Sequence, residues 1–315
     1  MHARLAAARA LVPAVRLHAC FIASLVATSM AAHANAAAGA EPIRAPAQSG
    51  PVLTLADQPL RLIRGATLYR AAAGVAVQRD DILETAGGNA GAQLEAGLDA
   101  IVALGPDTRV LVTNLAADGK SGVGLALLRG WVKVAVGSGR RALVATPGLQ
   151  VTLAGGSAIV RSQDGRDAVF AEDGAQQAAK VDGKGKAGAP LRLAPEQYAD
   201  TDPAKAQPMA GRPPPAFVAA MPLAFRDRLV RAPAVPNAGK VALVKERDVD
   251  FADVEAWLAA PLPARRGFAA RFRPRLADPA FRRQVERVFG RSAEWQAVLQ
   301  PPRPAKPAQP ASTLF

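Results

Sequence analysis

The sequence predicts a mainly β fold, a β-sandwich or a β-solenoid-like roll of short strands, followed by a small α-helical region. Within residues 59–199, short apolar runs such as 100–104 and 109–112 alternate with glycine turns about every ten residues. Beyond residue 216 the apolar period changes from 2 to 3.6, which is typical of helices. This order of elements argues against a βαβ nucleotide-binding enzyme.

Turns and alternation define the strands of this β region. Residues 62–70 predict a strand pair or a bulged strand around Gly65, because an interior glycine weakens a straight ladder. Residues 92–96 and 149–153 alternate apolar and polar side chains, so each predicts a strand with one buried face. Asp-Gly pairs supply the positive φ angles of tight hairpins. Three such pairs, nine residues apart, predict successive coils or hairpins of one sheet: 164–165, 173–174 and 182–183.

Residues 1–36 are typical of a secretory signal peptide. Arg4, Arg9 and Arg16 supply positive charge without an acid, and residues 20–32 are uncharged and mostly apolar. Small residues at 32–36 fit a cleavage site, and a membrane span needs about 20 apolar residues. We therefore expect export to the periplasm with a cleaved signal, a retained anchor being the alternative. An Ala- and Pro-rich stretch over 37–58 predicts a disordered linker.

Every histidine and cysteine of the chain lies in this signal segment: His2, His18, Cys20 and His33. A cleaved protein would therefore have no Ser-His-Asp or Cys-His catalysis. The usual zinc, copper and haem ligand sets would also be missing, as would disulfides. We expect no catalytic residue, no cofactor and no metal site.

A proline-rich linker over 200–216 leads to a basic helical region over 217–300, and a disordered tail follows over 301–315. Asp250 is a predicted N-cap before an apolar face that ends at Leu258, and the pair Asp278-Pro279 predicts a second helix start. Residues 212–315 carry 18 Lys and Arg against 9 Asp and Glu. This excess indicates either codon bias or an anionic partner.

The β region resembles the FecR-type domain. The resemblance rests on four pieces in order: residues 80–85 (DDILET), 105–110 (GPDTRV), 127–134 (LLRGWVKV), and 144–147 (VATP) together with 151–158 (VTLAGGSA). It implies a non-catalytic module of the cell envelope, used in signalling or protein binding. The helical region resembles an extension attached to some stand-alone proteins of this type.

The candidate partner-binding residues form two groups. Trp131 and Lys133 share a strand face, where an exposed tryptophan beside a lysine would stack on a sugar or anchor a partner, although such a tryptophan is often half-buried between sheets. Nine arginines lie within residues 265–291, and they form either a solvated face or a docking surface for anionic lipid or an acidic protein. A signal peptide argues against nucleic acid. The arginine candidates are Arg265, Arg266, Arg271, Arg273, Arg283 and Arg287.

Two alternatives to a non-enzymatic periplasmic interaction protein stay open. The first is an envelope enzyme that acts on polysaccharide with carboxylates alone, for which the adjacent acids Asp80-Asp81 and Glu172-Asp173 are the candidates. Adjacent residues of a strand point to opposite faces, which argues against either pair acting alone. The second is a membrane-surface adaptor that uses the arginines. The Asp-Gly turns are also candidate calcium ligands. The sequence identifies no small-molecule substrate.

Overall fold

A computed structural model describes residues 50–97, 99–115, 122–202 and 208–300. The predicted signal peptide, most of the predicted linker over 37–58 and the predicted tail over 301–315 lie outside these ranges. Within them, no helix is both long enough and apolar enough to cross a membrane.

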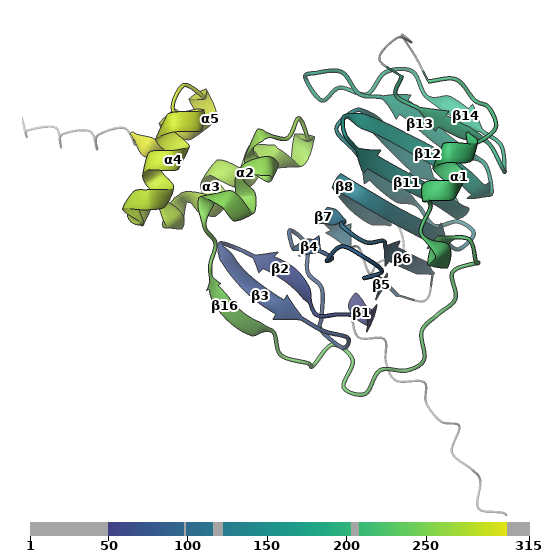
Figure 1. The fold of residues 1–315 in the computed structure, drawn as a ribbon, viewed down its shortest axis with the longest axis horizontal. Helices are drawn as coiled ribbons and strands as arrows, with labels where there is room; N and C mark the ends of the chain where they lie inside the picture. Colours follow the sequence, from purple (N-terminus) through teal and green to yellow (C-terminus); the bar gives the residue numbers. More distant parts are fainter. Residues whose placement is uncertain (1–49, 98, 116–121, 203–207, 301–315) are drawn as a thin grey trace, which may run out of the picture. The chain divides into compact units, whose positions relative to one another are not determined.

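The fold is mainly β, as the sequence predicts, and the described strands form two layers that share one strand (Figure 1). The first sheet has the order β1-β5-β6-β8-β11-β12-β15, and the second has the order β16-β3-β2-β4-β7-β8-β9-β10-β13-β14. The strands are β1 (Val52–Ala56), β2 (Leu60–Arg64), β3 (Thr67–Ala71), β4 (Ile82–Glu84), β5 (Ala92–Glu95), β6 (Ala100–Leu104), β7 (Arg109–Leu115), β8 (Val123–Val136), β9 (Ala142–Ala145), β10 (Leu149–Leu153), β11 (Gly156–Gln163), β12 (Arg166–Asp173), β13 (Gln176–Lys180), β14 (Leu191–Leu193), β15 (Tyr198–Asp200) and β16 (Val244–Asp248).

Strand β8 joins the two sheets. Its first part pairs with β7 and, in parallel, with β9, and its second part pairs with β6 and β11. Gly130 lies between these parts with φ of 94°, and a Cβ there would collide with Thr108. The Thr108 hydroxyl receives a hydrogen bond from the Trp131 N–H (3.0 Å). A glycine is therefore required where the strand changes sheets.

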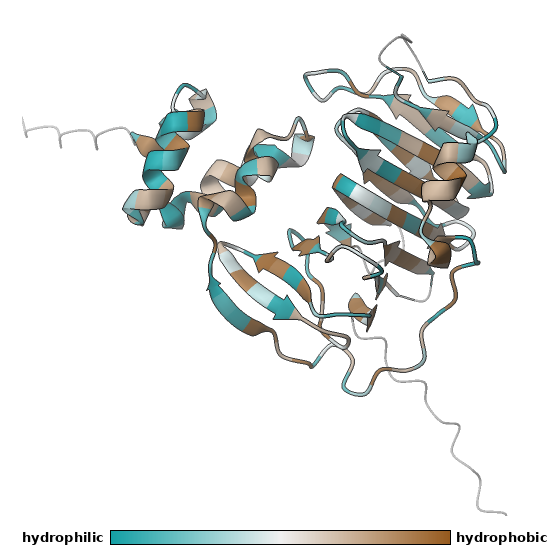
Figure 2. Ribbon diagram, in the orientation of Figure 1, coloured by the Kyte–Doolittle hydropathy of each residue, from teal (hydrophilic) through white to brown (hydrophobic). Residues whose placement is uncertain are grey.

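The main core lies between the sheets and follows the alternation in the sequence. Five residues of β8 and β10 are fully buried there: Val132, Val134, Leu149, Val151 and Leu153. They belong to one apolar cluster with residues from both sheets. Figure 2 shows hydrophobic and hydrophilic residues alternating along the strands.

The outer face of each sheet is covered by a later part of the chain. On the second sheet, Ile63, Ile82 and Leu111 share a cluster with apolar residues of the helical region, including Trp257. On the first sheet, Trp131, Ile159 and their neighbours pack against the segment 213–231, here called the strap. The helices are α1 (Pro215–Ala220), η1 (Leu223–Phe225), α2 (Phe251–Ala259), η2 (Pro263–Gly267), α3 (Phe268–Phe272), η3 (Arg273–Ala277), α4 (Pro279–Phe289) and α5 (Ala293–Leu299).

Both predicted helix starts are present. Asp250 caps α2 in a capping box with Asp253, and Asp278 accepts a hydrogen bond from the Ala280 N–H at the start of α4 (2.8 Å). Capping boxes satisfy backbone donors that would otherwise lack partners. The helical region therefore begins each of these elements where its sequence indicates.

Three local expectations are wrong. Strand β1 lies inside the stretch assigned to a disordered linker, and it pairs with β5 because Leu53 fills the core. Strand β16 lies inside the region predicted to be helical and pairs with β3. The Asp164-Gly165 turn closes the β11–β12 hairpin, but Asp173-Gly174 is a corner that leads from the first sheet to the second.

Candidate functional site

Trp131 and Lys133 are buried under the strap rather than exposed for a partner. The Lys133 ammonium donates to Glu172 Oε1 (2.6 Å) and to the strap carbonyls of Phe225 (2.9 Å) and Asp227 (2.7 Å). A buried ammonium is stable only when its donors are satisfied, and here each of the three has an acceptor. The prediction of a binding role for this pair is therefore wrong, because the chain itself occupies their face of the sheet.

Aromatic packing closes the same face. The Trp131 ring lies 5.1 Å from the ring of Phe217 in the strap, and Phe217 also makes an edge contact with Tyr198 (4.9 Å). The Arg161 guanidinium lies over Trp131 at 5.2 Å. No ring face of Trp131 is therefore left for stacking on a sugar.

The two carboxylate pairs do not form a glycosidase-like constellation. Asp81 is buried and receives two hydrogen bonds from Arg64 (2.8 and 2.6 Å), while Glu172 is paired with Lys133. A polysaccharide-acting enzyme needs two carboxylates across one bond, and here each pair has one acid neutralised by a basic residue. In the described ranges no group of three or more acids is placed to hold a metal ion.

Four of the nine arginines in residues 265–291 hold the helical region together or fix it to the β region. Arg265 donates to the Leu258 carbonyl (3.1 Å), and Arg275 donates to the Val249 carbonyl and to Asp278 (both 2.7 Å). Arg282 pairs with Glu286 one turn along α4, and Arg271 binds the β region. Arg265 and Arg271 therefore have structural contacts, although both are binding candidates from sequence.

The other five arginines are exposed, and none forms an ion pair or a side-chain hydrogen bond within the part of the chain that the structure describes. Two of them, Arg283 and Arg287, lie four residues apart and so share one face of α4. The opposite face of α4 is packed through Phe281 and Val285. We call these five the exposed arginine group: Arg266, Arg273, Arg283, Arg287 and Arg291.

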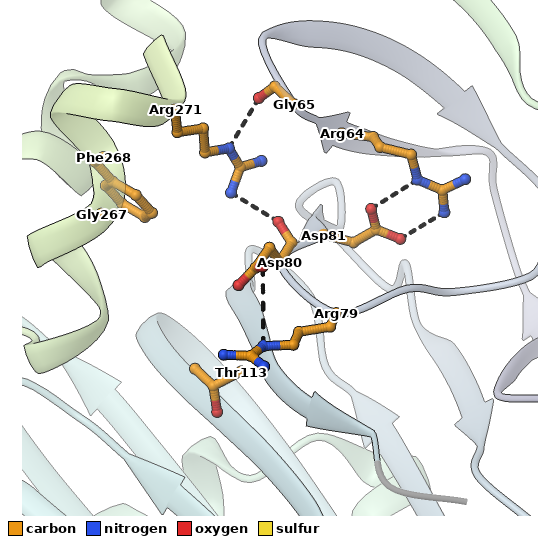
Figure 3. Close-up of a pocket in the computed structure, with 9 residues that line it drawn as sticks. All are labelled: Arg64, Gly65, Arg79, Asp80, Asp81, Thr113, Gly267, Phe268 and Arg271. Carbon is orange, nitrogen blue, oxygen red and sulfur yellow. Dashed lines mark hydrogen bonds and ion pairs between the residues drawn. The ribbon is translucent and has the colours of Figure 1, made fainter. Parts of the chain in front are cut away.

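A cavity of about 590 Å³ lies where α3 meets the β region (Figure 3). Its walls come from the β2–β3 turn, the loop before β4, strand β7 and the start of α3. The lining residues are Arg64, Gly65, Arg79, Asp80, Asp81, Thr113, Gly267, Phe268 and Arg271.

Three arginines line this cavity, and Arg271 is the one that forms no ion pair with a carboxylate of the described residues. Its guanidinium donates to the carbonyls of Gly65 (2.8 Å), Asp80 (2.7 Å) and Ile63 (2.9 Å), and these are neutral acceptors. Arg64, by contrast, is neutralised by Asp81. Burial lowers the pKa of Arg271 to about 10, and the charges of Asp80 and Asp81 only partly offset this effect.

The sequence does not predict the cavity as a site. The adjacent acids Asp80 and Asp81 and the basic Arg271 are separate candidates there, because Arg271 lies 191 positions from Asp80 along the chain. A helical region that packs on a sheet brings them together. No local pattern in the sequence signals this contact.

Comparisons with known proteins show limited similarity to this chain. No family model matches it, and no curated protein matches it. Two crystal structures of "a putative anti-sigma factor" from Parabacteroides distasonis align with TM-scores of 0.34. They are 17% and 16% identical, and the alignment covers 42% of this chain and 59% of theirs. The chain therefore spans less than two thirds of the length of these structures.

Proposed function

We propose that the protein is a non-enzymatic FecR-like module of the periplasm, which binds an acidic envelope protein through the exposed arginine group. One observation carries this proposal. Of nine arginines in 27 residues of sequence, four are engaged in structural contacts, whereas five are exposed and form no ion pair or side-chain hydrogen bond with the described residues. Arginine is well suited to bind carboxylates because its planar fork donates two parallel hydrogen bonds.

The packing of α4 favours a protein partner over insertion into a membrane. A helix that lies in a lipid interface buries its apolar face among the acyl chains. In α4 that face is occupied, because Phe281 and Val285 are buried and Phe251 contacts both Phe281 and Phe289. Apart from Val288, which is 45% exposed, the free surface of α4 is its charged side, and this favours electrostatic docking.

Charge reversal tests the docking. We expect Arg283→Glu with Arg287→Glu to abolish salt-sensitive capture of acidic envelope proteins by the exported chain, with the same thermal unfolding. The matched control is Arg192→Glu with Lys240→Glu, which changes the net charge equally at exposed sites outside the helices. Equal losses in both double variants would show that only the overall charge matters and would contradict the proposal.

Vesicles test the membrane-surface alternative. Each basic residue near an anionic membrane contributes about 1 kcal/mol, so Arg283→Gln with Arg287→Gln, which removes two charges, predicts a loss of about thirtyfold. If the exported chain binds phosphatidylglycerol vesicles with this dependence on Arg283 and Arg287, and captures no acidic protein, the partner is a lipid surface.

Export is tested separately. We expect the envelope fraction to hold a chain that begins near residue 35 or 37, because the small residues at 32–36 fit signal cleavage. N-terminal sequencing of the purified protein reads this directly. An intact Met1 on a cytoplasmic protein would overturn the periplasmic location.

A further inference from the structure

We propose that the cavity between α3 and the β region is a binding site for a small hydroxylated organic anion that carries one carboxylate or phosphate group. Sugar acids and sugar phosphates belong to this class. The proposal goes beyond the proposed function, because Arg283 and Arg287 do not line the cavity.

The size of the cavity favours an organic ligand. Pockets for small molecules enclose roughly 300–1,000 Å³, and this one encloses about 590 Å³. Two glycines lie in its wall, Gly65 at the β2–β3 turn with φ of 59° and Gly267 at the start of α3. Because both are glycines, neither position has a side chain that fills the cavity.

The charges of the lining favour a single negative group. Arg64 and Asp81 neutralise each other through two hydrogen bonds. Arg79 and Asp80 are both exposed at the rim, and their closest atoms are 3.9 Å apart, which is too far for a hydrogen bond. Arg271 is the remaining charge. An anion would therefore compensate a guanidinium whose hydrogen bonds within the chain go only to neutral carbonyls.

Arg271 also has donors to spare. A guanidinium has five N–H groups, and three of them are used by the carbonyls of Ile63, Gly65 and Asp80. Stacking on Phe268 and Phe272, at 5.6 and 5.2 Å from their ring centroids, fixes its plane. A fixed guanidinium with two free N–H groups is suited to a carboxylate or a phosphate.

The remaining polar groups favour hydroxyls on the body of the ligand. The Asp80 carboxylate is exposed and accepts no hydrogen bond from the described residues, so it is free to accept one from a ligand hydroxyl. The Thr113 hydroxyl likewise has no partner among the described residues. Asp80 adopts φ of 69°, a conformation that a non-glycine residue keeps only where its surroundings impose it. Here the Asp80 N–H donates to Val112 and the Asp80 carbonyl accepts from Arg271.

Calorimetric titration with four defined probes tests the site. Glucuronate tests the carboxylate, glucose 6-phosphate tests the phosphate, oligogalacturonate tests the end of an acidic polymer, and glucose tests the uncharged body. We expect saturable binding of glucuronate or glucose 6-phosphate and none of glucose. Absence of saturable binding for both small anions would overturn the proposal, even if oligogalacturonate binds, as would equal binding of glucose.

Arg79→Gln locates the site, because Arg79 is at the rim with 73% of its side chain exposed and its one ion pair among the described residues is with Asp80 at 3.9 Å. Without this positive charge the Asp80 carboxylate repels an anion in the cavity, so we expect several-fold weaker binding with unchanged thermal unfolding. Arg192→Gln on β14 is the matched control, since five strands separate β14 from β4. If Arg79→Gln and Arg192→Gln both leave the affinity unchanged, the anion binds elsewhere and the proposal fails.

Arg271→Lys provides the second variant. It keeps the positive charge but loses the planar fork, so the anion should bind more weakly while the helical region stays attached. Arg283→Glu with Arg287→Glu should leave the titration unchanged. A failure of anion binding alone would therefore leave the proposed docking function standing, and the reverse also holds.

Discussion

The two outer faces of the sandwich are covered in opposite ways. On the first sheet, a lysine of the sheet reaches out and binds the carbonyls of a short strap. On the second sheet, arginines of the helical region reach in: Arg271 binds carbonyls of the β2–β3 turn and its neighbours. We call the strap the first cover and the helical region the second cover. In both, a cationic side chain of one segment binds main-chain carbonyls of the other: Lys133 of the sheet binds the strap, and Arg271 of the helical region binds the β region.

The covers differ in how many such contacts they use. The strap is held at two places: Lys133 and the ring of Phe217 hold its first part, and Arg231 at its end pairs with Glu95 (2.8 Å) and donates to the Gly97 carbonyl (3.0 Å). The helical region has a larger apolar interface around Trp257 and additional ion pairs, among them Arg61 with Asp253 (2.6 Å). The strap has the smaller apolar cluster of the two, so we expect one substitution at Lys133 to weaken it more than one substitution weakens the helical region.

The largest loss of stability is expected in the core between the two sheets, because both the strap and the helical region pack on these sheets. Val134 is fully buried between the sheets, and an aspartate there would place an unpaired charge in an apolar core at a cost of several kcal/mol. Domains are stable by only about 5–15 kcal/mol. We expect Val134→Asp to abolish the β spectrum in circular dichroism, while Val244→Asp on the exposed strand β16 should keep it. A cooperative melt of Val134→Asp would contradict this packing.

Lys133→Ala should break the first cover. It removes the ion-pair partner of Glu172, which keeps only the Ser157 hydroxyl (2.7 Å), and leaves two strap carbonyls without their donor; removing one partner of a buried pair costs about 3–5 kcal/mol. Urea unfolding measures the loss. Lys133→Met together with Glu172→Gln removes both charges and should cost less. If both variants lose the same free energy of unfolding, the destabilisation comes from the lost side-chain volume and not from the unpaired carboxylate.

Acid should weaken the second cover. Burial alone would raise the pKa of Asp253, but hydrogen bonds from Arg247 and the Asp250 N–H and the charges of Arg247 and Arg61 outweigh burial and hold this pKa below its ordinary value. A carboxyl with a lowered pKa stabilises the fold above its unfolded pKa of about 3.9. This stability is lost as pH falls through the folded pKa.

Asp253→Asn isolates this contribution. The loss of charge-assisted hydrogen bonds from Arg61 and Arg247 predicts a cost of about 1.5–3 kcal/mol at pH 7. The difference from the wild type should shrink as the pH falls below about 4. Urea unfolding of both proteins at about pH 7 and below about pH 4 measures this difference in the free energy of unfolding. A difference that does not change with pH would show that Asp253→Asn destabilises the fold through packing and not through the lost charge.

The smallest effect on stability is expected outside both covers. Arg283→Glu with Arg287→Glu should change the free energy of unfolding by less than about 0.5 kcal/mol, as for ordinary surface substitutions. A clear destabilisation would show that these arginines belong to the second cover. It would also remove the observation that supports the docking function.

The exposed arginines also show what a sequence leaves open within one element. Arg282 and Arg283 are adjacent in α4, yet one pairs with Glu286 and the other has no described partner. Helical spacing allows either pair, because residues three or four apart are neighbours on a helix, and only the structure shows that Glu286 pairs with Arg282. Arg271 contacts carbonyls about 200 positions away, and no spacing rule reaches that far.

The sequence by itself determined the class of the fold and many of its boundaries. Period-2 alternation placed the buried faces of β5 and β10, and the caps Asp250 and Asp278 placed the starts of α2 and α4. These signals are local, because each depends on side chains that are neighbours along a strand or a helical turn.

Only the tertiary structure decided what lies on the outer faces. Alternation shows that Trp131 and Lys133 share one face of β8, but it does not show that the strap covers this face. Strand β16 is charged and fully exposed, so no apolar pattern marks it, and it exists because β3 offers an edge. The anion cavity likewise arises where α3 meets loops of the β region. In each case the deciding contact joins segments that are distant along the chain, and their pairing depends on the packing of the whole fold.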